Sequence, residues 1–169
     1  MGTLRRRRPG DPEKPLAKAR DPEAARMDAV ALLARRDFAS GELVQKLGSQ
    51  GYDAAVAAAV VAELIEARML DDARYAENYV AYHSGRGHGP VRIGADLRSM
   101  GMAADLIQAA LATGPDWREL ARAIRTRKFG AEPPEGWSEK TRQARFLQYR
   151  GFSSDHIRAA TGAEFDPDS

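Results

Sequence analysis

The sequence predicts an all-α protein built from three tandem three-helix repeats. The first observation behind this prediction is a period of fifty residues, marked by Gly51, Gly101 and Gly151. A leucine stands four positions before each glycine, and a large apolar residue follows each one. The second observation is the spacing of apolar residues by three and four between these marks, which is typical of amphipathic helices. A repeat of this length indicates small units that bury their cores together, and such arrays usually bind other macromolecules.

The first repeat is expected over residues 23–71. Its first helix begins at Glu23 and ends near Phe38, and Ser40 is the candidate N-cap of the second helix. Gly51 ends the second helix, because a left-handed residue after a helix costs glycine little. Asp53 is the next candidate N-cap, and an apolar stripe predicts a third helix that runs to about residue 69.

The second repeat is expected over residues 72–113, with Asp72 as the N-cap of its first helix. The glycine-rich string GRGHGP follows this helix at residues 85–90 and lacks the lysine and hydroxyl of a phosphate-binding loop. We therefore interpret it as a turn between helices. Pro90 suits the first turn of the next helix, and Gly101 closes that helix.

The third repeat is expected over residues 114–161. It opens at Asp116, whose spacing to Glu119 matches a capping box. The loop AEPPEG at residues 131–136 is longer than its counterparts. Outside the repeats, residues 1–22 are basic and proline-rich and predict a disordered arm, and residues 162–169 predict an acidic tail.

Composition excludes several classes of function. The chain of 169 residues has no cysteine, which removes disulfides, thiolate catalysis and cysteine-type zinc sites. No run of apolar residues is long enough for a membrane span, and the arginines near the N-terminus do not precede one, so we expect a cytoplasmic protein without a signal peptide. The three histidines, His83, His88 and His156, are not spaced as a metal site. We predict no catalytic residues, no metal and no cofactor.

Basic residues are the stronger indication of function. Residues 114–158 hold ten basic and six acidic residues, whereas residues 23–71 hold five and eight. Arg118, Arg122 and Arg125 recur at spacings of four and three, so they are expected to share a helix face that Lys128 continues. The next helix and the second repeat supply further basic candidates: Arg142, Arg145, Arg150, Arg86, Arg92 and Arg98. An ordinary solvated face is the alternative interpretation.

Two aromatic residues accompany this basic face. Trp137 and Tyr149 are candidates for stacking against a partner, and we expect at least one of them to pack against the core instead.

Several strings together resemble the RecX family of RecA regulators over about residues 24–160. They are ALLARRDFASGELVQKL followed by GY, MLDDARYAENYV, GPVRIGADLRSMG, KFG, and RFLQYRGFSSDHI. The resemblance implies an elongated, curved array of right- or left-handed sense. It also implies a protein that binds the RecA filament on DNA and dampens its ATPase, strand-exchange and coprotease activities in DNA repair and the SOS response. Arg74 and Tyr75 lie in the motif that opens the second repeat.

The expected partner is therefore the RecA filament, bound by a monomer that is not an enzyme. Single- or double-stranded DNA is a further partner for the basic faces. The alternative function is a stand-alone helical DNA-binding protein, although the last helix of the first repeat lacks the Arg, Asn and Gln residues that read bases.

Overall fold

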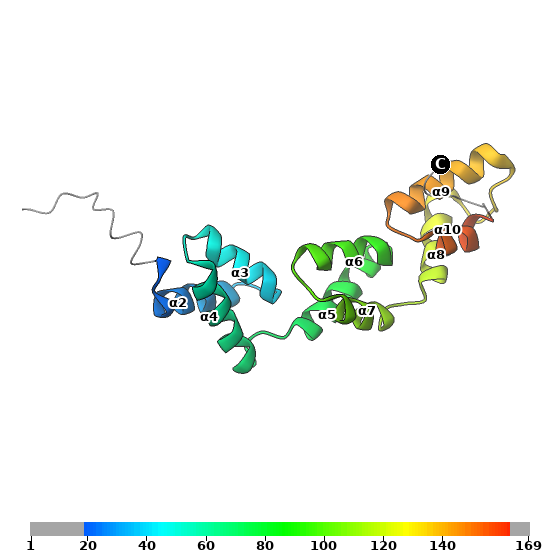
Figure 1. Ribbon diagram of the computed structural model, residues 1–169. Helices are drawn as coiled ribbons and strands as arrows, with labels where there is room; N and C mark the ends of the chain where they lie inside the picture. Colours follow the sequence, from blue (N-terminus) through cyan, green and yellow to red (C-terminus); the bar gives the residue numbers. More distant parts are fainter. Residues whose placement is uncertain (1–18, 163–169) are drawn as a thin grey trace, which may run out of the picture. The chain divides into compact units, whose positions relative to one another are not determined.

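The computed structural model describes residues 19–162 and is helical throughout that range (Figure 1). The arm expected at residues 1–22 lies mostly outside the described residues, and so does the tail from residue 163 onward. Residues 19–22 are described, and the first helix begins one residue before the expected Glu23. Pro22 begins a helix, and Asp21 caps it by accepting hydrogen bonds from the N–H groups of Glu23 and Ala24.

The described chain divides after Asp71 into two compact units. The first unit contains α2 (Pro22–Leu33), α3 (Ser40–Ser49) and α4 (Ala54–Glu66). Its core is built from alanine and leucine on α2 and α3 and from valine and leucine on α4. The Tyr52 hydroxyl donates a 2.6 Å hydrogen bond to Asp28 Oδ2 and so ties the α3–α4 turn to α2. Burial and the neighbouring carboxylate of Asp28 raise the pKa of Tyr52 to about 12.

The second unit contains two three-helix repeats. The second repeat consists of α5 (Asp72–Gly85), α6 (Pro90–Ser99) and α7 (Ala104–Ala112). The third consists of α8 (Trp117–Phe129), α9 (Gly136–Tyr149) and α10 (Ser154–Thr161). The prediction of an all-α protein made of three three-helix repeats is thus confirmed within residues 19–162.

The fifty-residue marks are three copies of one helix-ending motif. Gly51, Gly101 and Gly151 have φ angles of +96°, +83° and +87°, as the sequence predicts. In each repeat the N–H of the residue after the glycine donates to the carbonyl of the leucine, at 3.3, 3.3 and 3.1 Å. The glycine N–H donates to the carbonyl three residues before it. This is the Schellman motif, whose hydrophobic contact joins the leucine to the apolar residue after the glycine.

Some predicted helix ends differ from the structure by a few residues. The first helix ends at Leu33, and Ala39 occupies the N-cap position of α3 that we assigned to Ser40. Asp72 is the first residue of α5 and not its cap. Asp116 does cap α8, accepting from the N–H groups of Arg118 and Glu119.

Candidate partner-binding surface

The second and third repeats are joined by backbone hydrogen bonds between α6 and α9. The Gly89 N–H donates to the Arg150 carbonyl at 2.8 Å, and the Val91 N–H donates to the Gly151 carbonyl at 3.0 Å. Both donors lie at the N-terminus of α6, where no side chain caps the helix, and both acceptors follow the C-terminus of α9. Each helix therefore satisfies the free backbone groups of the other, with the partial charges of the two helix ends opposed.

Glycine is required at this junction for steric reasons. A Cβ atom on Gly89 would collide with the carbonyl of Gly151, and a Cβ on Gly151 would collide with the Cβ of Arg92. Gly87 has a φ of +80°, and a Cβ there would collide with Ile124 of α8. The GRGHGP string is therefore a turn between helices, as predicted, and it is also the place where the third repeat docks on the second.

A cluster of arginine and aromatic side chains surrounds these backbone bonds. Arg150 Nη1 donates to the Arg86 carbonyl at 3.3 Å, and the Arg86 guanidinium lies 4.5 Å from the centre of the Tyr82 ring. The exposed fractions are 56% for Tyr82, 57% for Val91 and 82% for Tyr149. We call this cluster the junction surface, and it consists of Tyr82, Arg86, Val91, Arg92, Tyr149 and Arg150.

Composition makes the junction surface suitable for binding a macromolecule. Tyrosine and arginine are enriched at the energetic centres of protein interfaces, because each combines a large contact area with directed hydrogen bonds. Sequence reasoning found the arginines but missed Tyr82 and Val91. The sequence signal that could have found them is their position on either side of the glycine-rich turn at residues 85–90.

A column of half-buried rings on α5 leads to the junction. The Tyr79 and His83 rings are 4.0 Å apart between centroids, and His83 Nδ1 lies 3.2 Å from His88 Nδ1. At this separation one nitrogen must accept the proton that the other donates, so the two rings cannot both be protonated. The histidines are therefore not ordinary surface residues.

Burial and neighbouring charges both lower the pKa of these histidines. Burial lowers the pKa of His83 and of His88, and Arg92 lowers both further. Arg86 acts on His83 in the same direction and Arg150 on His88, whereas the Asp96 carboxylate opposes the shift at both rings. Asp96 also accepts a hydrogen bond from Tyr79 and, after burial, contributes to a Tyr79 pKa of about 12.

The prediction that Arg125 lies on a solvent-facing basic face is wrong. Its side chain is only 6% exposed, although Arg118 and Lys128 of the same helix are exposed. The Arg125 guanidinium donates to the carbonyls of Ala131 and Glu132, to Gln143 Oε1 and to the Thr126 hydroxyl. The helix periodicity correctly placed these residues on one face of α8. The loop after α8 and helix α9 then cover the C-terminal end of that face, and so they bury Arg125.

The buried arginine takes the place of an apolar residue in the second repeat. Arg125 is the ninth residue of α8, and Val80 is the ninth residue of α5. Gln143 stands eight residues before its repeat glycine, where the other repeats have Leu43 and Ile93. All of these positions are buried, so a polar pair replaces an apolar pair in the third core. A glutamine at a position that is leucine or isoleucine in the other repeats was the sequence signal that could have revealed this polar pair.

Arg122 is also largely committed within the third repeat. Its Nε donates to the Ala159 carbonyl in the last turn of α10 at 3.1 Å, and its guanidinium pairs with Glu119. It therefore satisfies a free carbonyl at a helix end. Arg142 is exposed but forms a two-point ion pair with Glu139 at 2.8 and 3.0 Å, and the hydrogen bond from Arg142 lowers the pKa of that carboxyl.

The other predicted residues differ in exposure. Tyr75 is half-buried, with its hydroxyl 3.7 Å from Met100 Sδ. Besides Arg122 and Arg142, the exposed basic candidates outside the junction surface are Arg74, Arg98, Arg118, Lys128 and Arg145. The expectation that Trp137 or Tyr149 packs against the core is wrong, because they are 81% and 82% exposed.

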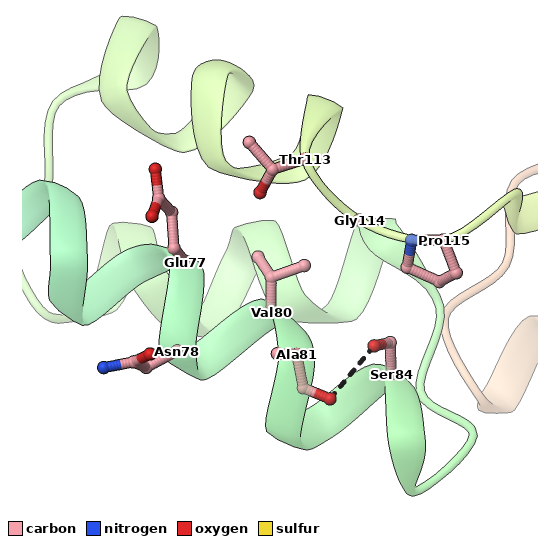
Figure 2. Close-up of a pocket in the computed structure, with 8 residues that line it drawn as sticks. All are labelled: Glu77, Asn78, Val80, Ala81, Ser84, Thr113, Gly114 and Pro115. Atoms are coloured by element: carbon pink, nitrogen blue, oxygen red, sulfur yellow. Dashed lines mark hydrogen bonds between the residues drawn. The ribbon is translucent and has the colours of Figure 1, made fainter.

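A cavity of about 490 Å³ lies between α5 and the segment that connects α7 to α8 (Figure 2). Glu77 and Asn78 line it from α5, and Thr113 lines it from the connecting segment. The Ser84 hydroxyl donates to the Ala81 carbonyl at 3.2 Å, as the dashed line in Figure 2 shows, so its proton is directed at the backbone and not at the Glu77 carboxylate. This lining does not form a catalytic constellation.

Residues 19–162 lack two further kinds of feature. This part of the chain contains no group of three or more His, Asp or Glu side chains that could hold a metal ion. None of its helices is long and apolar enough to cross a membrane.

Three family models match consecutive parts of the chain. The models describe the first, second and third three-helix domains of RecX, and they match residues 25–64, 71–111 and 116–161. A regulatory protein RecX of Halorhodospira halophila is 44% identical over 147 residues, which are 86% of this chain and 91% of the relative. One from Stenotrophomonas maltophilia is 40% identical over 141 residues, covering 83% and 85%.

The fold has counterparts among solved structures. The crystal structure of RecX from Lactobacillus salivarius matches with a TM-score of 0.71 at 19% identity, over 85% of this chain and 96% of that chain. A second crystal structure of a regulatory protein RecX matches with a TM-score of 0.70 at 22% identity, over 84% and 72%. At this level of identity, the two structures support the fold alone.

Proposed function

This chain belongs to the RecX family of regulatory proteins, and we propose that it binds the RecA filament on DNA and inhibits it. The three matched domains span most of the chain, in the order of the repeats. In this proposal the chain lowers ATP hydrolysis, strand exchange and coprotease activity, and it does so by binding without a catalytic step.

The observation that carries the proposal is the junction surface. Arginine and tyrosine side chains gather where two repeats are joined by backbone hydrogen bonds, so they are held in fixed relative positions. A surface fixed in this way can prefer one arrangement of neighbouring RecA subunits. If ATP turnover needs that arrangement to change, preferential binding to one arrangement is sufficient for inhibition.

The residues proposed to contact the filament are a revised set. Arg86, Arg92 and Arg150 form its centre, with Arg98 and Arg145 on the adjoining helices α6 and α9. Arg74, Tyr75, Arg118, Lys128 and Arg142 remain secondary candidates. Arg125 is removed because it is buried, and Arg122 because it holds α10.

The test adds the purified chain to RecA on single-stranded DNA and follows ATPase activity and filament length together. We expect the wild-type chain to lower ATPase activity. The variant with Arg86→Glu and Arg92→Glu should lose most of this inhibition, because a like-charged contact replaces an attractive one.

A matched control carries the same change of charge on the first unit. Arg35 and Lys46 are exposed on the first repeat, and both are replaced by glutamate in the control variant. Inhibition equal to wild type is expected for this control. Equal inhibition by the junction variant and the control would remove the junction surface from the proposal, and no inhibition by the wild-type chain would refute the proposal itself.

DNA binding is the second candidate function. The exposed rings of Tyr82 and Tyr149, set among arginines, favour it because such rings stack on unpaired bases without sequence preference. Fluorescence anisotropy of a labelled single-stranded oligonucleotide, measured without RecA over a salt series, tests it. Tight binding that Tyr149→Ala weakens would support this second function.

A further inference from the structure

The loop between α8 and α9 is held from beneath by hydrogen bonds from Arg125. Gly130 and Gly136 at its ends have φ angles of +95° and +73°, where other residues are strained. Two consecutive prolines lie between them, and Pro134 is buried. From beneath, Arg125 donates to the Ala131 carbonyl at 3.1 Å and to the Glu132 carbonyl at 2.9 Å.

Burying Arg125 to hold this loop costs stability. The acceptors of its hydrogen bonds are backbone carbonyls, an amide and a hydroxyl, so none of them neutralises the guanidinium charge. The second repeat shows that apolar residues, Val80 and Ile93, fill the equivalent positions. An apolar core would therefore suffice for the fold, and the arginine serves to position the loop.

The first turn of α9 presents an exposed aromatic side chain just after this loop. Trp137, the second residue of α9, is 81% exposed. Glu132 and Glu135 of the same loop are exposed as well. We call residues 130–137 the anchor loop. A large side chain on a fixed backbone loses little entropy on binding, and tryptophan is the residue type most enriched among interface hot spots.

We propose that Trp137 inserts into an apolar pocket bordered by Lys or Arg on the protein partner, with Arg125 as the positioning residue of the anchor loop. This inference rests on the proposed function, in which the partner is a RecA subunit. The anchor loop, which carries Glu132 and Glu135, would be a second, acidic contact beside the basic junction surface.

Charge decides between a protein and a nucleic acid as the partner of this loop. The carboxylates of Glu132 and Glu135 would repel phosphates, whereas basic groups around a protein pocket would attract them. The junction surface is basic and can face acidic groups, so the two surfaces require different parts of a partner.

The primary test replaces Trp137 with alanine. Since the side chain is exposed, the fold should be unchanged, which circular dichroism checks. The binding of the full chain to RecA filaments on single-stranded DNA is then measured by co-sedimentation. We expect affinity to fall by about 10-fold to 100-fold, the range of an interface hot spot. The control is Met27→Ala on α2, which removes another exposed apolar side chain, 67% exposed, and should leave affinity unchanged.

A double-mutant cycle tests the role of Arg125. Arg125→Met should weaken filament binding when Trp137 is present and have little further effect in the Trp137→Ala background. A purely structural role would lower binding equally in both backgrounds. Should Arg125→Met fail to fold, a Gly136→Ala variant, which disturbs the loop backbone from its other end, takes its place in the cycle.

Three outcomes separate the possibilities. Unchanged affinity for Trp137→Ala, with a wild-type chain that binds and inhibits, overturns this inference and leaves the proposed function intact. A wild-type chain that neither binds nor inhibits overturns both. If Trp137→Ala instead weakens the binding of a bare oligonucleotide, the partner of the anchor loop is a nucleic acid and the inference is wrong.

Discussion

Replacing Gly151 by alanine should separate the docking of the third repeat from the ending of its helix. Gly51 provides the matched comparison, because it occupies the same place in the first repeat. Its φ angle of +96° is close to the +87° of Gly151. A Cβ atom on Gly51 would meet nothing within 4 Å, whereas one on Gly151 would collide with Arg92.

The expected magnitudes follow from these two environments. At either glycine the left-handed backbone makes alanine unfavourable by about 1–2 kcal/mol. At Gly151 the crowding adds about 1–3 kcal/mol. If the junction opens to relieve it, the two backbone bonds of Gly89 and Val91 are lost, at about 1 kcal/mol each. We therefore expect about 1–2 kcal/mol for Gly51→Ala and about 2–5 kcal/mol for Gly151→Ala.

Urea unfolding with two signals measures both variants. The two tryptophans of the chain, Trp117 and Trp137, lie in the third repeat, so their fluorescence reports the second unit, while circular dichroism reports all helices. Gly151→Ala should lower the midpoint of the fluorescence transition, and Gly51→Ala should not. As a control, Gly48→Ala inside α3 should stabilise the first unit slightly, because a Cβ there has open space. Equal losses for Gly51→Ala and Gly151→Ala would refute the close docking of α6 and α9.

Four further substitutions have expected outcomes. Arg125→Met should destabilise the third repeat by about 2–4 kcal/mol in fluorescence-monitored unfolding. Adding Gln143→Leu should recover part of that loss, because it removes the buried amide oxygen that Arg125→Met deprives of its hydrogen-bond donor. Acidification should destabilise the second unit, because the pKa values of His83 and His88 are lowered in the folded chain. The contribution of these histidines to folding stability is complete above pH 6.5, their ordinary pKa, and is lost as the pH falls below it. Unfolding midpoints measured across pH should depend less on pH in His88→Gln, and an unchanged dependence would contradict this. Tyr52 has a raised pKa, so its contribution is complete below pH 10 and lost as pH rises toward about 12. Tyr52→Phe should flatten the alkaline decline measured by circular dichroism.

Local chemistry explains why the repeats could be predicted from the sequence. The Schellman motif needs a glycine with positive φ, a buried residue four positions before it and an apolar residue after it. All three requirements fall within six consecutive residues, so the pattern Leu47, Gly51, Tyr52 shows them without knowledge of distant contacts.

The basic residues show where the same reasoning fails. Spacing placed Arg118, Arg122 and Arg125 on one face of a helix correctly, but it could not tell which of them the following loop would cover. That Trp137 and Tyr149 are both exposed was not predicted, because apolar character alone favours burial. For Arg125 the decisive contact comes from another segment of the chain.

The three-helix repeats and the glycine motifs that end their middle helices could be predicted from sequence, since each depends on hydrogen bonds and side chains a few residues apart. Which arginines remain available for a partner, and where the second and third repeats meet, depends on contacts between distant segments. The Gly89 and Gly151 backbones lie far apart in sequence, and only folding brings the free N–H groups of one helix to the free carbonyls of another.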